Sequence, residues 1–177
     1  PPEPGPQDLA IAPRPVPPVR KRPKPGERRV QILQTLASML EQPGSERITT
    51  AALASRIGVS EAALYRHFAS KAQMFEALIE FIESSVFTLV NQIAEHESSG
   101  LAQAQKVLTV VLQFGERNPG MARVMVGDAL VFENERLGAR MNLFFDRIES
   151  HLRQSLRLAA DASGSMTPTA DAQVKAS

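Results

Sequence analysis

The chain has 177 residues, of which 43% are hydrophobic and 22% charged, a composition typical of a globular protein with one or two domains. It contains no cysteine, which excludes disulfides and thiolate metal sites, and no uninterrupted apolar run approaches the roughly 18 residues of a membrane span. No signal-peptide pattern opens the chain, so we expect a cytoplasmic protein without a membrane partner.

The N-terminal segment is basic and rich in proline. Residues 1–29 carry seven Lys or Arg against three acids, and ten of the 13 prolines lie in residues 1–25. Because proline interrupts helices and strands, we expect residues 1–27 to form a disordered arm. The basic stretch VRKRPKPGERR (19–29) is either a solvated tail or an arm that follows DNA phosphates. The motif that comes after it favours the second interpretation.

Residues 28–72 have the pattern of three short helices. Apolar residues three and four apart predict the first helix from residue 27 onward, with a stripe formed by Val30, Leu33, Leu36, Ala37 and Leu40. Pro43 and Gly44 break this pattern, so we expect the helix to end before them.

The next two helices carry the signals of a helix-turn-helix. In ITTAALASRIG, Thr49 or Thr50 can cap a helix that Gly58 ends in a left-handed conformation. Ser60 caps the following helix, and the small residue Ala54 stands where the two helices cross. The inward apolar positions of this corner are Leu53, Ile57, Val59, Leu64 and Phe68. A plain helical hairpin is the alternative, but it does not explain the basic arm upstream.

The stretch SEAALYRHF supplies residues expected at DNA, because the second helix of such a motif enters the major groove. Ala62 and Ala63 let the backbone approach the base edges, and their methyl groups can contact thymine. Tyr65 and His67 can reach phosphates, although either one can instead be a packing residue. Arg66 can read guanine or contact a phosphate.

Lys71 follows the cap residue Ser70 at the start of the next helix. A lysine is unfavourable there, because the helix dipole places positive charge at the N-terminus. A bound DNA phosphate would explain this lysine, and a stray surface residue is the alternative.

The stretch TTAALASRIGVSEAALYRHFASKAQMF resembles the DNA-binding domain of TetR-type regulators, whose second motif helix ends in a Leu-Tyr-x-His-Phe-x-x-Lys run. The resemblance implies a TetR-like fold, in which a helix-turn-helix head (28–72) stands on a helical bundle. It also implies double-stranded DNA as a partner, contacted by Thr49, Thr50, Ser60, Ala62, Ala63, Tyr65, His67 and Lys71. Of these, Tyr65, His67 and Lys71 would lie mainly on phosphate.

The rest of the chain is predicted to be helical, so the fold class is all-α. A long helix from Met74 to Ile93 has two apolar stripes, one expected against the head and one against the other helices. Further helices are predicted at residues 101–117, 120–132 and 135–158. Residues 73–160 would form a regulatory, dimerisation and partner-binding domain, followed by a small, polar, flexible tail at 161–177.

The run RITTAALASRIGVSEAALYRHFASKAQMFEALIEFIE, together with GERNPG, resembles the SlmA-type nucleoid occlusion factors from about residue 28 to 158. This resemblance implies a nucleoid-associated protein that binds specific chromosomal sites and prevents ring assembly by the division protein FtsZ. In that family the partner surface lies at positions matched here by Phe81, Arg117 and Asn118. Family chains usually continue with two helices that complete a dimer interface, so we expect a homodimer where those helices are present.

The partner-surface residues also have an interpretation of their own. Phe81 stands between Glu80 and Glu83, an apolar spot with a polar rim, which is the anatomy of a small interaction hot spot. Arg117 and Asn118 stand at a predicted helix C-terminus, where they can instead bond the last carbonyls.

Two other function classes are weaker. His96 and Glu97 begin like a zinc-protease motif, but Gly100 stands where the second histidine belongs. The chain also has no nucleophile elbow and no phosphate loop, so we expect no enzyme, no cofactor and no metal. A ligand-responsive TetR-type transcriptional repressor is the remaining alternative, although few polar side chains interrupt the apolar stripes of the body.

Overall fold

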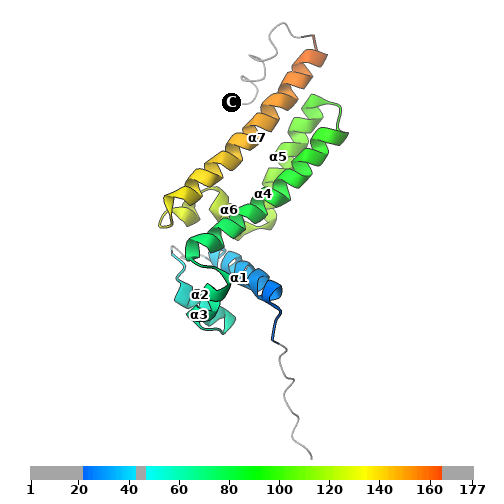
Figure 1. The fold of residues 1–177 in the computed structure, drawn as a ribbon. Helices are drawn as coiled ribbons and strands as arrows, with labels where there is room; N and C mark the ends of the chain where they lie inside the picture. Colours follow the sequence, from blue (N-terminus) through cyan, green and yellow to red (C-terminus); the bar gives the residue numbers. More distant parts are fainter. Residues whose placement is uncertain (1–21, 43–46, 165–177) are drawn as a thin grey trace, which may run out of the picture.

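The computed structural model describes residues 22–42 and 47–164, and all regular structure in these ranges is helical. The elements are α1 (Pro25–Leu40), α2 (Thr50–Ile57), α3 (Glu61–His67), α4 (Lys71–His96), α5 (Gly100–Arg117), α6 (Pro119–Met125), the 3-10 helix η1 (Asp128–Leu130) and α7 (Glu135–Ala162). In Figure 1, α1, α2 and α3 form a head at one end of a long body made of α4, α5 and α7. The predicted all-α class is confirmed.

The first helix begins at Pro25, inside the segment that the sequence interpretation assigned to the disordered arm. Proline is well tolerated at the first position of a helix, because its missing N–H would have no partner there. Glu27 then accepts a hydrogen bond from the backbone N–H of Lys24 at 3.1 Å, which completes the start of α1. Residues 1–21 of the expected arm and 165–177 of the expected tail lie outside the described residues.

The buried face of α1 differs from the predicted stripe. The helix buries Ile32, Leu36 and Leu40, which are four residues apart, whereas Val30 is 53% exposed and Leu33 is half-buried. Spacings of three and four allow two overlapping stripes on this helix, and packing selected the one that includes Ile32.

The helix-turn-helix is confirmed in its details. The hydroxyl of Thr49 accepts from the Ala52 N–H at 3.1 Å, and Ser60 likewise accepts from Ala63 at 3.2 Å. Gly58 ends α2 with φ 80° and ψ 37°, the left-handed conformation that glycine adopts without strain. The corner encloses Leu53, Ala54, Leu64 and Phe68, each at most 3% exposed.

The long helix α4 joins the head to the body. It buries eight side chains, namely Met74, Phe75, Leu78, Ile79, Ile82, Val86, Phe87 and Val90. The sequence pattern counted Leu89 among the apolar stripe residues and left out Phe87. In the structure Phe87 packs against Phe144 of α7 with ring centroids 5.2 Å apart, while Leu89 is 47% exposed. By length and composition alone α4 could also cross a membrane, a property that core helices of soluble proteins share.

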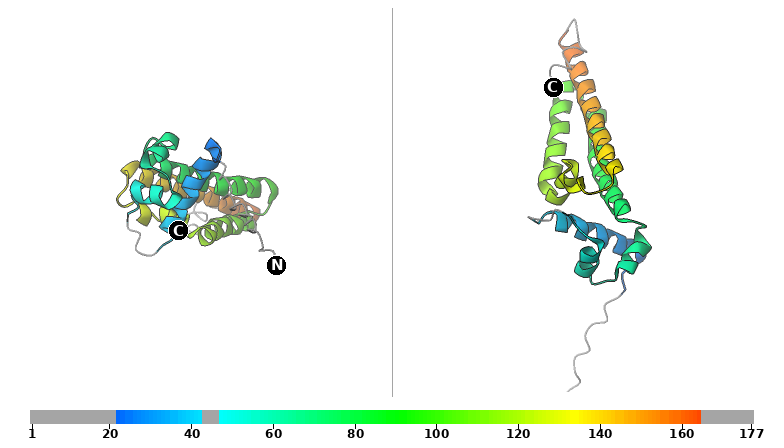
Figure 2. Two further views of the ribbon diagram at one scale, coloured as in Figure 1. Left: turned by 90° about the horizontal axis from the view of Figure 1, so that it is seen from below. Right: turned by 90° about the vertical axis from the view of Figure 1, so that its left-hand side faces the viewer.

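The segment between α5 and α7 differs from the predicted single helix at 120–132. It consists of α6 and η1, separated by Gly127 with φ 87°. The final helix extends to Ala162, beyond the predicted end at 158 and the proposed domain boundary at 160. Figure 2 shows α6 at the junction between the head and the lower ends of the body helices.

Two contacts hold α6 against the head. A Cβ atom added at Gly120 would lie 2.1 Å from the carbonyl oxygen of Ala37, so only glycine permits this approach to α1. Arg123 donates from Nη1 to the carbonyl of Leu40 at 2.8 Å and so satisfies a carbonyl at the end of α1.

Candidate functional site

The exposed face of α3 is the centre of the candidate DNA-binding site. Residues of a helix turn by about 100° each, so the buried Leu64 and Phe68 leave Ala62 and Arg66 on the opposite side. Ala62 and Arg66 are exposed. Tyr65 lies on the flank towards α2, and its hydroxyl donates to Thr50 Oγ1 at 3.4 Å. The helix thus presents a small residue and a guanidinium outward.

Thr50 connects α2 with the start of α3. Its hydroxyl donates to Glu61 Oε2 at 2.9 Å and accepts from Tyr65, so three polar side chains form one short chain. Tyr65 is nevertheless 44% exposed, and its ring is available to a partner. Glu61 was missed as a member of this group, because its place in the first turn of a helix already explained an acid there.

Thr49 and Ser60 have a structural role in addition to any contact with DNA. Each uses a hydroxyl lone pair to cap a helix, and within residues 22–42 and 47–164 no acceptor takes its hydroxyl proton, which can therefore be donated to an oxygen of a partner. The two caps therefore place O–H donors at the starts of α2 and α3.

The other flank of α3 is anchored to α1 by Arg29. Its Nη1 donates to the carbonyl oxygen of His67 at 3.0 Å, and its guanidinium carbon lies 4.1 Å from the centre of the Phe68 ring. These contacts fix the end of α3 against α1. Arg29 belongs to the basic stretch 19–29, and the only sequence signal for its structural role is its position within the first helical turns.

Lys71 has an intramolecular partner that neither sequence interpretation anticipated. Its Nζ lies 2.6 Å from Oε1 of Glu133, and the two side chains are only 19% and 10% exposed. It is therefore neither a stray surface lysine nor a free cation at the head. The residues are 62 positions apart, so the pairing carried no local sequence signal.

The second candidate site surrounds Phe81 on α4. Phe81 is 49% exposed, and its ring centroid lies 6.3 Å from that of Phe114 on α5. A groove of about 330 Å³ on one side is lined by Val30, Leu33, Gln34, Leu78, Phe81, Asn118 and Met121. A smaller groove of about 180 Å³ contains Arg117, Asn118 and Phe114 in its lining.

The three residues expected at the partner surface thus lie around adjacent grooves. Asn118 also takes the structural role that sequence analysis left open, since its Nδ2 donates to the carbonyl of Phe114 at 2.8 Å. Arg117 is exposed at the end of α5, and the described part of the chain offers it no ion-pair partner.

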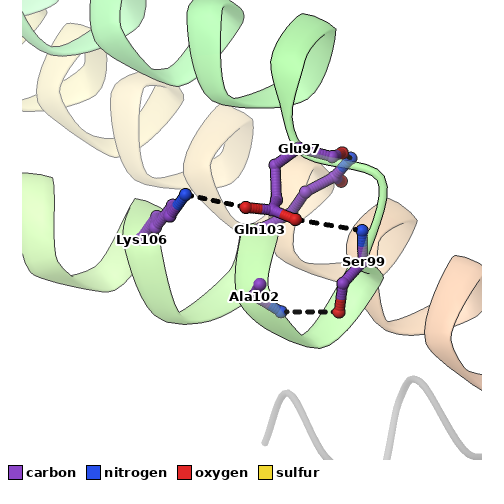
Figure 3. A network of polar contacts seen from close by, with 5 residues as sticks. All are labelled: Glu97, Ser99, Ala102, Gln103 and Lys106. Carbon is purple, nitrogen blue, oxygen red and sulfur yellow. Dashed lines mark hydrogen bonds and ion pairs between the residues drawn. The ribbon is translucent and has the colours of Figure 1, made fainter.

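Glu97 belongs to the turn between α4 and α5 (Figure 3). Its carboxylate accepts from Lys106 Nζ at 2.7 Å and from the Ser99 N–H at 3.2 Å. The hydrogen bond from Lys106 and then that from Ser99 lower the pKa of this carboxyl group. Ser99 in turn caps α5 by accepting from Ala102 at 3.3 Å. The His96–Glu97 pair is therefore part of a helix connection.

Two family models match the chain. Residues 32–78 match the model described as bacterial regulatory proteins, tetR family, and residues 98–177 match the SlmA-like model described as a tetracyclin repressor-like C-terminal domain. The first match contains α2, α3 and the caps described above. The second begins just before α5.

Similar proteins agree with these matches. The chain is 57% identical over 136 residues to the nucleoid occlusion factor SlmA of Marinomonas sp. strain MWYL1, covering 77% of this chain and 69% of that protein. It is also 57% identical over 136 residues to SlmA of Aliivibrio fischeri strain MJ11, with 76% and 69% covered.

Solved structures show the same fold at low sequence identity. PfmR, a TetR family transcriptional regulator from Thermus thermophilus, has a TM-score of 0.64 at 21% identity, with 75% of this chain and 72% of that chain covered. The ketosteroid transcriptional regulator KstR2 of Mycobacterium tuberculosis has a TM-score of 0.62 at 21% identity, with 76% and 69% covered. Together with the helix-turn-helix geometry and the 57% identity, these matches show that the chain belongs to the TetR family of regulatory proteins and, within it, to the family of the nucleoid occlusion factor SlmA.

Proposed function

We propose that this chain binds specific chromosomal DNA through α2 and α3 and, at those sites, inhibits ring assembly by the division protein FtsZ. The observation that carries the proposal is the exposed face of α3, in a chain 57% identical to proteins named nucleoid occlusion factors. We further propose that the protein is cytoplasmic, stays with the nucleoid, and acts as a homodimer that reads two half-sites about one DNA turn apart.

The DNA-binding half of the proposal rests on how α3 is presented. Ala62 and Ala63 let its N-terminal turn approach base edges in the major groove, where Arg66 can also reach. Thr50 and Tyr65 on one flank and His67 on the other would bond the two phosphate backbones, a role that their places on opposite flanks of α3 support. Thr49 and Ser60 add hydroxyl donors, and Lys71 can join them by exchanging Glu133 for a phosphate.

The division-protein half rests on the surface around Phe81. A half-exposed aromatic ring in the wall of an apolar groove, with polar residues at the rim, is the usual anatomy of an interaction hot spot. The larger groove is lined mainly by apolar side chains, which suits a peptide segment that inserts apolar side chains of its own. Arg117 at the rim would pair with an acidic group of that segment.

The two surfaces can be tested separately, because they share none of their proposed contact residues. Tyr65→Ala with His67→Ala should abolish specific DNA binding, since both side chains are expected on phosphate. Phe81→Ala should leave DNA binding intact but weaken the interaction with FtsZ at least about tenfold, as expected for a hot-spot aromatic. Leu112→Ala, on an exposed leucine of α5 outside both grooves, is the matched control.

Co-sedimentation with FtsZ polymers, with and without genomic DNA fragments, measures both activities together. The proposal requires that the chain enters the polymer pellet and shortens the polymers when DNA is present. A full-length protein that ignores the polymer and instead releases DNA on adding a small metabolite would be a ligand-responsive TetR-type repressor, the alternative function.

A further inference from the structure

A basic crevice separates the N-terminal end of α1 from α3. It has a volume of about 400 Å³, and its rim is formed by Arg22, Arg28, Arg66 and His67. Its floor includes the fully buried Ile32 and Leu64. No carboxylate belongs to the described residues that line it. We propose that this crevice binds phosphodiester oxygens of duplex DNA, which makes Arg22 and Arg28 DNA-contacting residues.

The charges around the crevice favour the binding of an anion. Three guanidiniums that converge without an acid repel one another, and apolar walls strengthen their field in the opening. Arg28 donates from Nη1 to Gln31 Oε1 at 2.8 Å, which holds its side chain in place. The guanidinium carries five N–H donors, so this bond leaves others for phosphate oxygens.

The walls of the crevice are held in a defined geometry. Arg29 ties α1 to the end of α3 through the carbonyl of His67 and the ring of Phe68. On the arm side, Pro23 and Pro25 restrict the backbone on either side of Lys24 and so limit the positions open to Arg22. A site that is ordered before binding loses less entropy when the ligand arrives.

The position of the crevice identifies its anion. A helix in the major groove has one phosphate backbone on each flank. The flank towards α2 carries Thr50 and Tyr65, and the crevice lies on the opposite flank, beside Ala63 and His67. When α3 enters the groove, the crevice therefore faces the strand that the α2 side does not contact.

The inference rests on the proposed DNA binding, and the test separates the two. The probe is a fluorescent DNA duplex of mixed sequence, because phosphate contacts do not depend on sequence. Anisotropy titrations of the full chain at several salt concentrations give the slope of log affinity against log salt, which changes by about 0.9 for each phosphate contact.

Arg22→Gln and Arg28→Gln should each reduce the slope by about 0.9 and weaken binding to all sequences alike. Arg22 is exposed and precedes α1, so its variant retains the fold. Arg157→Gln, which removes the same charge from an exposed position on α7, should change nothing. Arg28→Lys retains the positive charge, so its slope of log affinity against log salt should stay close to the wild-type value.

If Arg22→Gln and Arg28→Gln have the same salt slope as Arg157→Gln while wild-type binding depends on salt, the proposed phosphate contacts in the crevice are wrong. DNA binding by the chain would then still stand. A folded wild-type chain that shows no salt-dependent binding at any concentration would overturn both.

Discussion

The ammonium Nζ of Lys71, at the first residue of α4, lies 2.6 Å from Oε1 of Glu133, in the segment that leads into α7. This ion pair ties the start of α4, directly after the DNA-binding helices, to the segment that precedes α7. Together with the bond from Arg123 of α6 to the Leu40 carbonyl of α1, it attaches the stretch from α6 to the start of α7 to the head at two points. The orientation of the DNA-binding head therefore depends on this body segment.

Glu133→Gln should lower the free energy of unfolding by about 1–3 kcal/mol, because it leaves a mostly buried ammonium without its carboxylate. Urea denaturation of wild type and variant measures the difference. Lys106→Gln, which breaks the more exposed pair with Glu97, should lower the free energy of unfolding by less than Glu133→Gln does, because solvent screens that pair. Equal costs for the two variants would mean that burial does not strengthen the Lys71 pair.

The double variant Lys71→Glu with Glu133→Lys separates the structural role of the pair from a contact with DNA. Stability should return towards the wild-type value, because the pair is restored with reversed charges. DNA affinity should remain reduced at least about tenfold, since a carboxylate at position 71 would repel the phosphate. Wild-type affinity in this variant would show that Lys71 acts on DNA only through Glu133.

Gly120→Ala should lower the free energy of unfolding by about 1–3 kcal/mol and also weaken DNA binding. The added Cβ would lie 2.1 Å from the Ala37 carbonyl oxygen, which is backbone, so α6 must move away from α1. Thermal melting and DNA titration measure the two effects. Gly138→Ala is the control, because its Cβ would meet nothing within 4 Å in α7 and should stabilise the helix by up to about 1 kcal/mol.

Arg29→Lys should destabilise the head by about 1 kcal/mol although it retains the charge. Lysine lacks the planar group that covers the Phe68 ring while bonding the His67 carbonyl. Urea denaturation measures the cost, and Arg157→Lys on α7 is the matched control. A variant as stable as wild type would show that charge alone holds α1 to α3.

Stability should fall on the acid side because of His151. Burial, and then the nearby charge of Arg147, lower the pKa of its imidazole. The folded state therefore favours neutral histidine, while the unfolded chain takes up a proton once the pH falls below about 6.5. The contribution of neutral His151 to the free energy of unfolding is complete above that pH. It is lost as the pH falls towards the lower pKa of the folded state, by at most about 1.4 kcal/mol per pH unit.

Urea denaturation from about pH 7 to about pH 5 measures this dependence, because the range begins above the ordinary histidine pKa and extends below it. His151→Gln should flatten the profile over that window. An equally steep profile in the variant would assign the acid sensitivity to other groups.

Local chemistry was enough to predict the helix-turn-helix from sequence. Thr49, Gly58 and Ser60 determine where α2 and α3 begin and end through contacts within a few residues, so the pattern and the structure agree. The inward Leu64 and Phe68 follow from their spacing in a short helix. The predicted face of α3 needed no information from the rest of the chain.

Tertiary packing decided the points that spacing left open. The stripe of α1 could run through Val30 or through Ile32, and burial against other helices selected Ile32. The predicted helix at 120–132 breaks because Gly127 adopts a left-handed turn that brings η1 back into the core.

The partners of charged residues were also decided by the tertiary structure. Lys71 meets Glu133, and Arg22 and Arg28 converge with Arg66, only because the chain brings distant segments together. The sequence by itself determined the all-α class, the motif and the residues that α3 presents, since these depend on neighbours within one or two helical turns. Only the tertiary structure decided which charges are paired and which remain open to a phosphate, because an ion pair depends on distance in space and not along the chain.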